Sequence, residues 1–294
     1  MQPFHKTRLA PTPSGFLHLG NAFSFILTAA IASKHGASIL LRIDDLDRSR
    51  VKREYLADIF DTLTFLDIDW DEGPRTVNET LKSYSQHRRL ALYKESISEL
   101  NAKGFLFPCA CSRKDLASAG LLGGCTGRCQ TKEEPFALKL KECPERLAIH
   151  LYASGISYLP YPKSTSQFIV QKKDGLPSYH LASVVDDIHF GVDLVVRGKD
   201  LWDSSLAQVY LASLTHGLQP YTATTFFHHS LVTENGAKLS KSAGHTSIQH
   251  LRKKGLSKEA MYQQAGAFFG LQEKVSNLQE FTQVVHPMRI IGTE

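Results

Sequence analysis

The chain has 294 residues, 42% of them hydrophobic, and is therefore long enough to bury a large core. Its 20 glycines and 12 prolines are no excess, and the sequence has no repeat or low-complexity run, which excludes collagen-like, solenoid and disordered proteins. The net charge of +5 suits a polyanionic partner, but many enzymes carry a similar charge.

Neither a secretory nor a membrane segment is expected. The first nine residues lack the apolar stretch of a signal peptide. The most apolar run, residues 22–32, is shorter than the roughly 20 residues that cross a bilayer. An odd number of cysteines, five, argues against a disulfide framework. We therefore expect a cytoplasmic, monomeric protein with no membrane contact.

The N-terminal part of the chain predicts an α/β unit. Residues 8–10 end a short strand, and prolines with a glycine keep residues 11–15 out of regular structure. Residues 18–34 have apolar side chains at helical spacing, and Gly36 suits the end of that helix. A buried strand at residues 39–43 then completes a βαβ unit. Further helices are expected at residues 53–66 and 80–103.

The middle of the chain has a different pattern. Glycine, proline and cysteine interrupt residues 105–166, where only short strands such as 147–152 are expected. Alternation then resumes, with a strand at 192–196, a helix at 201–215, a strand at 224–228 and a turn at Asn235-Gly236. We expect an α/β, Rossmann-type nucleotide-binding domain split into residues 1–104 and 167–242, an inserted module at 105–166, and a short helical C-terminal region at 243–294.

A first motif lies between the first strand and the first helix, where residues 11–21 are PTPSGFLHLGN. Nucleotides bind at this position in doubly wound folds, and a helix N-terminus offers free N–H groups to phosphate. Gly20 allows close approach of the backbone to a ligand, and His18 and Asn21 share one helix face. An ordinary helix start with an incidental histidine is the alternative.

A second motif, KLSKS at residues 238–242, follows the last expected strand. Two lysines, Lys238 and Lys241, can neutralise a triphosphate and stabilise the charge that builds on leaving pyrophosphate. A solvated basic turn is the more ordinary interpretation of such a run. Neither motif decides the function alone.

Together the two motifs resemble the paired signatures of class I aminoacyl-tRNA synthetases. RLAPTPSG at 8–15, LRIDDLD at 41–47, DGLPSYHLASVVDD at 174–187 and VRGKD at 196–200 are similar to glutamyl-tRNA synthetases, in the same order. The resemblance implies a catalytic domain that activates L-glutamate with ATP and Mg²⁺. It assigns catalysis to His18, Asn21 and Lys241, and ATP binding to His18, Gly20, Asn21, Lys238 and Lys241.

The same resemblance places a set of side chains around glutamate: Arg8, Leu9, Ala10, Pro11, Thr12, Asp44, Tyr179 and Arg197. These residue types match the charges of glutamate. Two guanidinium groups can pair with its two carboxylates, an acid can pair with its ammonium group, and a tyrosine can donate a hydrogen bond. The family usually has glutamate where this chain has Asp44, so that contact is a departure. Arg42 and Lys199 are interpreted as surface charge.

Four cysteines predict a metal site. Cys109-x-Cys111 and Cys125-x3-Cys129 have the spacing of a closed tetrahedral site, so one structural Zn²⁺ is expected. Reduced cysteines packed as small apolar residues are the alternative. Cys143 lacks a paired spacing and is expected to take no part.

The RNA acceptor is inferred from the short C-terminal region. About fifty residues follow the second motif, too few for an anticodon-binding bundle. This resembles the truncated glutamyl-queuosine tRNA(Asp) synthetases, which activate glutamate without tRNA and esterify queuosine in the anticodon. In that branch a tyrosine ligand is common where this chain has Cys125. The expected partner is the anticodon loop of tRNA(Asp).

Basic runs at residues 172–173 and 252–254 are candidates for holding the RNA backbone, and solvated surface patches are an equal alternative. Three other functions stay open. They are a truncated glutamyl-tRNA synthetase with another RNA acceptor, a small-molecule nucleotidyltransferase of the same superfold, and a non-catalytic RNA-binding relative.

Overall fold

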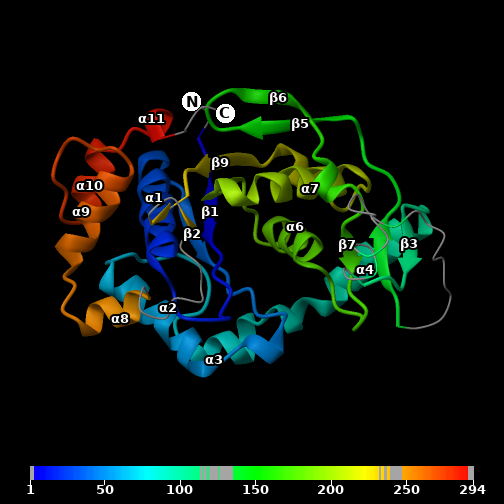
Figure 1. Ribbon diagram of the computed structural model, residues 1–294, viewed down its shortest axis with the longest axis horizontal. Coiled ribbons are helices and arrows are strands. Elements are labelled where there is room, and N and C mark those ends of the chain that lie inside the picture. The colour runs from blue at the N-terminus through cyan, green and yellow to red at the C-terminus, as the bar shows by residue number, and fades with distance from the viewer. Residues whose placement is uncertain are drawn as a thin grey trace. The chain divides into compact units, whose positions relative to one another are not determined.

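The computed structural model describes residues 3–112, 115, 118, 125, 135–231, 233–234, 237–238 and 247–290 (Figure 1). The chain divides into two compact units, each made of separate segments. The first comprises Met1–Arg88, Val192–Asp200 and Phe227–Glu294, and the second comprises Arg89–Gly191 and Leu201–Phe226. Among the described helices, none combines the length and the apolar character that a bilayer crossing demands.

The first unit is built on parallel strands. β1 (Lys6–Leu9) lies between β2 (Ser38–Leu41) and β8 (Leu194–Gly198), and the end of β9 (Thr225–His229) follows β8. The register runs from Lys6 opposite Ser38 to Leu9 opposite Leu41. α1 (Leu19–His35) joins β1 to β2, which confirms the βαβ unit.

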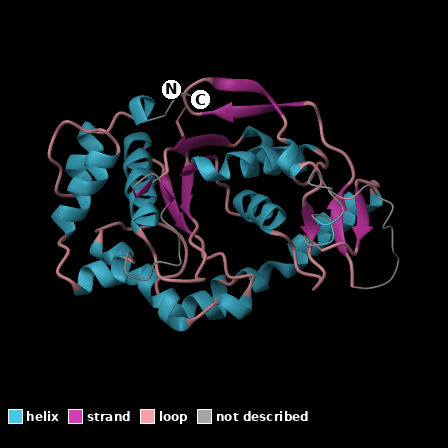
Figure 2. Cartoon of the chain, in the orientation of Figure 1, coloured by secondary structure: helices cyan, strands magenta, loops and turns pink. Residues whose placement is uncertain are grey.

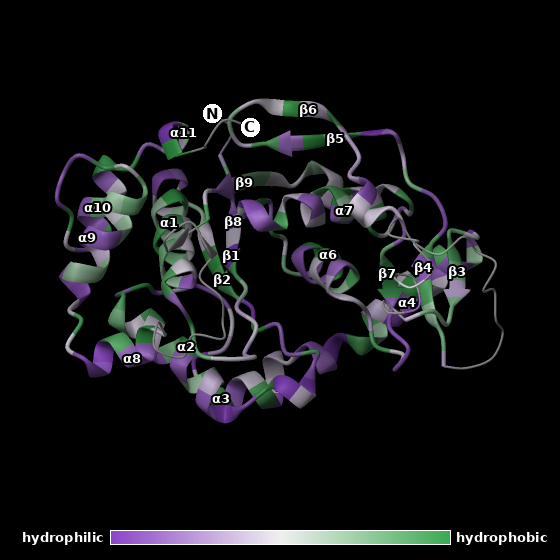
Figure 3. Ribbon diagram, viewed as in Figure 1, coloured by the Kyte–Doolittle hydropathy of each residue, from purple (hydrophilic) through white to green (hydrophobic). Residues whose placement is uncertain are grey.

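α1 is a buried helix, as its composition predicts. Most of its residues from Ala22 to Ala32 are inaccessible to solvent, and hydrophobic segments recur along it in Figure 3. Gly36 follows in the left-handed conformation with φ of 64°, and its N–H bonds to the carbonyls of the last turn. A residue without a side chain adopts this conformation at little cost, which explains why the helix ends there.

Helices make up most of the rest of the first unit (Figure 2). The predicted helical C-terminal region is present among its described residues. The C-terminal helices are α8 (Ile248–Lys253), α9 (Lys258–Phe268), α10 (Leu278–Val284) and α11 (Pro287–Ile290), and α2 (Arg53–Phe65) belongs to the N-terminal segment of the unit. Tyr262 on α9 donates from its hydroxyl to the Leu66 carbonyl at 2.6 Å, and α10 contacts α1. A two-stranded hairpin, β10 (Thr233–Glu234) with β11 (Ala237–Lys238), flanks the expected turn, whose residues lie outside the described part.

The single helix expected at residues 80–103 is wrong. The chain forms a short α3 (Val77–Glu79), a π-helical segment (Thr80–Tyr84) and a 3-10 helix (Gln86–Arg89), and only then α4 (Leu90–Ala102). Ser85 leaves the helical conformation at the break, with φ of −55° and ψ of 139°. The Gln86 N–H bonds to the Asp45 carboxylate at 2.8 Å, and the Gln86 side-chain oxygen accepts from the Leu46 N–H at 3.2 Å. These tertiary bonds replace helical ones, and apolar periodicity carries no sign of them.

The second unit contains an antiparallel sheet in the order β3 (Leu106–Cys109), β4 (Ala137–Leu140) and β7 (Ile169–Gln171). A separate hairpin joins β5 (Arg146–Leu151) to β6 (Gly155–Pro160), and β5 also pairs in parallel with the first residues of β9. Two further helices, α6 (Tyr179–His189) and α7 (Trp202–Ser213), contact each other, and α4 contacts α6.

A buried ion pair joins α4 to α6. Arg89, at the start of α4, donates from Nε and Nη2 to the two carboxylate oxygens of Asp186 at 2.7 and 3.0 Å. The hydroxyl of Tyr93 donates to the same carboxylate at 2.7 Å. Asp186 is fully buried, so its charge is compatible with folding only because these donors surround it.

We expect Asp186→Asn to destabilise the protein by about 3–5 kcal/mol, because it leaves the buried Arg89 guanidinium without its carboxylate. Tyr93→Phe removes one hydrogen bond to a charged group and should cost about 1.5–3 kcal/mol. Urea denaturation measures both. Asp174→Asn, which removes an exposed ion pair with Lys172, is the control and should cost under about 1 kcal/mol. An Asp186→Asn midpoint equal to that of the control would contradict the stabilising role.

Candidate functional site

The first signature forms the start of α1. His18 is the residue that caps the helix, and its backbone N–H donates to the side-chain oxygen of Asn21 at 3.1 Å. His18 and Asn21 therefore lie next to each other, as predicted. Both residues are half-buried, and so is Gly20. Capping uses one oxygen of Asn21, while an amide side chain also carries an NH₂ group that can donate to a ligand.

The chain that follows the second signature lies beside the first. Ser247 forms an antiparallel bridge with His18, and the Ile248 N–H donates to the Leu17 carbonyl at 2.8 Å. Of the signature itself, the Lys238 backbone belongs to β11, and Lys241 lies outside the described residues. Segments more than 220 positions apart in sequence are thus adjacent in the first unit, while the roles of the two lysines stay predictions.

Two guanidinium groups lie on adjacent strands. Arg8 on β1 is 7% exposed and Arg197 on β8 is 4% exposed. Arg8 reaches across to β8, where its Nη1 donates to the Val196 carbonyl at 3.2 Å. Two buried cations on neighbouring strands favour an anionic ligand, since each charge loses most of its hydration there.

A third buried group, His228 on β9, belongs to the same region, and no sequence motif indicates it. Burial lowers its pKa well below the ordinary value, and electrostatic interactions with Arg197, His229, Lys199 and Arg8 lower the pKa further. His228 is therefore neutral at physiological pH. A neutral imidazole occupies this region without adding a third positive charge to those of the two arginines. His228 reaches the region because β9 follows β8 and β1 in the strand order.

Asp44 lies in the loop after β2 and is buried, with 8% of its surface exposed. Its two carboxylate oxygens accept from Nε and Nη2 of Arg42 at 2.7 and 3.2 Å. Arg42 is only 3% exposed, so its interpretation as surface charge is wrong. The signal that could have found it is the position at the end of a buried parallel strand. A carboxylate keeps further lone pairs for another donor, and the contact of Asp44 with a substrate ammonium stays a prediction.

The remaining residues of the expected glutamate site differ in exposure. Leu9 and Pro11 are buried, Ala10 is half-buried and Thr12 is exposed. Tyr179 belongs to the second unit, where it begins α6 with 41% of its surface exposed. The structure therefore brings together those residues of the expected glutamate site that lie in the first unit. The role of Tyr179 stays a prediction.

Three of the four predicted metal ligands converge. The sulfur atoms of Cys109, Cys111 and Cys125 all lie within 4.8 Å of one another, and Cys109 and Cys125 are buried. Zn–S bonds of about 2.3 Å in a tetrahedron separate the sulfurs by about 3.8 Å, close to this arrangement. Thiolates are also the ligands that zinc prefers in structural sites. Cys129 lies outside the described residues, and Cys143 is exposed.

Comparison with known proteins identifies the family. The model for the catalytic domain of class I tRNA synthetases (E and Q) matches residues 5–120 and 128–291. A glutamyl-Q tRNA(Asp) synthetase of Symbiobacterium thermophilum is 36% identical over 86% of this chain and 83% of its own length. The glutamate–tRNA ligase 2 of Syntrophus aciditrophicus is 30% identical over 94% of this chain, which spans 60% of the length of that relative.

Solved structures agree on the fold. The crystal structure of a glutamate–tRNA synthetase from Elizabethkingia anophelis superposes with a TM-score of 0.78 at 19% identity, over 98% of this chain and 66% of the other. The paired signatures, the split α/β unit with its cysteine module, and the match along nearly the whole chain agree. The chain therefore belongs to the family of class I tRNA synthetases (E and Q) and carries their catalytic domain.

Proposed function

We propose that this chain activates L-glutamate with ATP and transfers the glutamyl group to queuosine in the anticodon of tRNA(Asp). The observation that carries the glutamate assignment is the pair of buried guanidinium groups, Arg8 and Arg197, on adjacent strands of the unit that also holds the start of α1. The choice of acceptor is supported by the relatives named glutamyl-Q tRNA(Asp) synthetase, of which this chain spans 83% and 81%.

Activation requires positioning and charge stabilisation more than covalent catalysis. An oxygen of the glutamate α-carboxylate attacks the α-phosphorus of ATP, the bond to the bridging oxygen breaks, and pyrophosphate leaves. Mg²⁺ bound to the phosphates of ATP would neutralise part of their charge. His18 and Asn21 lie at a helix N-terminus, where N–H groups favour phosphate. Lys241 then neutralises the charge that builds on the leaving group. No side chain acts as a nucleophile.

Selection of glutamate follows from the cost of a desolvated cation. The side-chain carboxylate of glutamate returns a negative charge to the buried Arg197 guanidinium, whereas the amide of glutamine does not. Arg8, on the adjacent strand, is the group that we assign to the second carboxylate. Because the pKa of His228 is lowered, this side chain stays neutral as the pH falls from neutrality toward that pKa. The positive charge around Arg8 and Arg197 therefore does not rise over this pH range.

Transfer forms an ester. A hydroxyl of the cyclopentenediol of queuosine attacks the carbonyl carbon of glutamyl-adenylate, loses its proton, and AMP leaves. Anticodon bases lie in a loop and can be turned out of the stack into a protein pocket. One structural Zn²⁺ held by Cys109, Cys111, Cys125 and Cys129 stabilises the module that carries these cysteines.

A second candidate is a glutamate–tRNA ligase that charges the 3′ end of a tRNA, because relatives with that name are 30% identical. Glutamate-dependent exchange of pyrophosphate into ATP without RNA separates both candidates from a non-catalytic RNA-binding protein and from a nucleotidyltransferase that uses another metabolite. Charging of queuosine-containing against queuosine-lacking tRNA(Asp) then separates the two. Efficient charging of the 3′ end of tRNA(Glu), with queuosine left unmodified, would overturn the acceptor assignment alone.

Lys241→Ala should slow glutamate-dependent pyrophosphate exchange roughly a hundredfold or more, equivalent to ~2.7 kcal/mol of transition-state stabilisation. The reason is the lost positive charge opposite the leaving pyrophosphate. Lys34→Ala, at the far end of α1, is the control and should keep full exchange. An exchange rate near that of the unmodified protein would remove Lys241 from the mechanism.

Arg197→Ala should abolish glutamate activation while ATP binding, measured by calorimetry, persists. The exposed Arg53 on α2 provides a matched control, and Arg53→Ala should activate glutamate normally. The decisive comparison is the ratio of exchange rates with glutamate and with glutamine. If the Arg197→Ala protein retained a strong preference for glutamate, the selectivity would belong to Arg8.

One zinc ion per chain is expected in protein purified without chelator, as elemental analysis measures. Cys109→Ser should weaken metal retention, because a buried thiolate ligand is lost. Cys125→Tyr should keep the metal, since related enzymes use tyrosine there, and the exposed Cys143→Ser is the control. Metal-free protein from such a purification would refute the site.

A further inference from the structure

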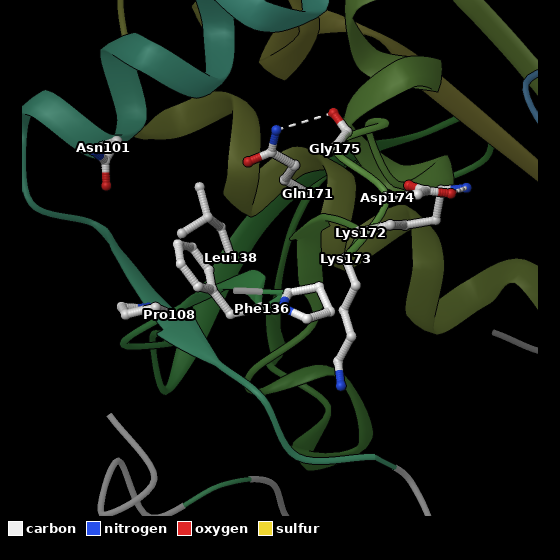
Figure 4. A pocket seen from close by; sticks show the side chains of 10 residues that line it. Asn101, Pro108, Phe136, Leu138, Gln171, Lys172, Lys173, Asp174 and Gly175 are labelled. Carbon is white, nitrogen blue, oxygen red and sulfur yellow. Dashed lines mark hydrogen bonds and ion pairs between the residues drawn. The ribbon is translucent and has the colours of Figure 1, made fainter. Parts of the chain in front are cut away.

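The second unit contains a pocket of about 570 Å³ on one face of the sheet β3-β4-β7 (Figure 4). Its floor follows one row across the strands, because Pro108 pairs with Leu138 and Leu138 pairs with Gln171. Phe136 extends the floor at the start of β4. Further along the same face Leu106 and Leu140 are buried, and α4 contacts β3, so the pocket is the part of the face that remains accessible.

The rim of the pocket is polar. Asn101, near the end of α4, and Gln171, at the end of β7, contribute two amide groups. The Gln171 amide nitrogen donates to the Gly175 carbonyl at 2.9 Å, and Figure 4 shows its amide oxygen turned to the side on which Asn101 lies. An apolar floor between amide groups suits a flat ring with hydrogen-bonding edges, as a nucleobase has.

Cations outnumber anions among the residues that line this pocket. Lys172 Nζ lies 2.9 Å from the Asp174 carboxylate, but the two side chains are 36% and 55% exposed, and ion pairs so accessible to water are weak enough to rearrange around a ligand. Lys173 Nζ donates to the neutral Ala110 carbonyl at 2.6 Å, and its charge also acts on the exposed Asp115, whose pKa is lowered by hydrogen bonds from Ser112 and, to a smaller extent, by Lys173. The pocket is therefore suited to an anionic ligand.

We propose that this pocket binds one unpaired nucleotide of the RNA, with the base on the floor formed by Pro108, Phe136 and Leu138 and a phosphate at Lys172. The inference rests on the proposed transfer to RNA and names where the RNA is held. The volume lies within the range of small-ligand sites, and an aromatic or apolar floor accepts any base through stacking. A base-paired nucleotide has its ring covered by its neighbours, so only a looped or single-stranded residue can enter.

The pocket is also joined to the cysteine cluster. Lys173 bonds to the carbonyl of Ala110, which lies between Cys109 and Cys111, and Pro108 of the floor directly precedes Cys109. Removing a metal from the cysteines therefore removes the support of one wall. Loss of the metal should weaken RNA binding while glutamate-dependent pyrophosphate exchange continues.

The test measures binding of a labelled RNA stem-loop with the anticodon sequence of tRNA(Asp), by fluorescence anisotropy across a salt series. Lys172→Gln should weaken binding and reduce the slope of log affinity against log salt by about 1, since one phosphate contact is lost. Leu138→Glu, which places a carboxylate on the floor, should weaken loop binding at least tenfold. Lys163→Gln is the matched control, because Lys163 is an exposed lysine of the same unit outside the pocket.

Either of two results would overturn the inference. In the first, the Lys172→Gln protein binds the RNA with the same affinity and salt slope as the Lys163→Gln protein. In the second, a blunt duplex of the same stem binds as tightly as the stem-loop. Circular dichroism and unchanged pyrophosphate exchange verify that the Lys172→Gln and Leu138→Glu proteins are folded. Failure of exchange in the unmodified protein would instead refute the proposed function. Intact exchange with unaltered RNA binding in both pocket variants would refute the pocket alone.

Discussion

The structure of the first unit depends on holding two like charges out of water on neighbouring strands. Folding must bring Arg8 and Arg197 together although 189 positions separate them, and it does so by placing β8 directly beside β1. Desolvating each guanidinium is costly, so the region accepts a neutral imidazole at His228 and a carboxylate already paired to Arg42. A dicarboxylic ligand would add negative charge beside these cations, which would link the stability of this region to substrate binding.

Much of the fold could be predicted from the sequence because its signals are local. The spacing of apolar residues and the left-handed Gly36 define α1, and the buried runs define β2, β8 and β9. The break at Ser85 could not be predicted, since it depends on Asp45 bonding to a backbone N–H some forty positions away. Helical propensity is a weak preference that such tertiary contacts override.

The site was predictable where residue types form a recognisable motif. His18 and Asn21 were singled out by their motif together with the family resemblance, and four cysteines by their spacing. The structure places His18 beside Asn21 and brings three of the four cysteines together, while their roles stay predictions. Arg42 and His228 were missed because their importance comes from burial and from the order of strands. A charged residue in a sequence looks the same whether solvent or a carboxylate surrounds it. The basic run at 252–254 illustrates this, since Arg252 bonds to Asp58 and the Asp61 carbonyl and packs on Phe65.

All five cysteines of the chain fall between residues 109 and 143, within the second unit, and the first unit has none. Thiol chemistry is therefore confined to one half of the molecule. An oxidant that attacks the cluster would act on the cysteine module and leave the residues of α1 and the arginine pair chemically untouched. Because Cys143 is exposed, it also offers a single attachment point for a spectroscopic label whenever metal protects the other four thiols.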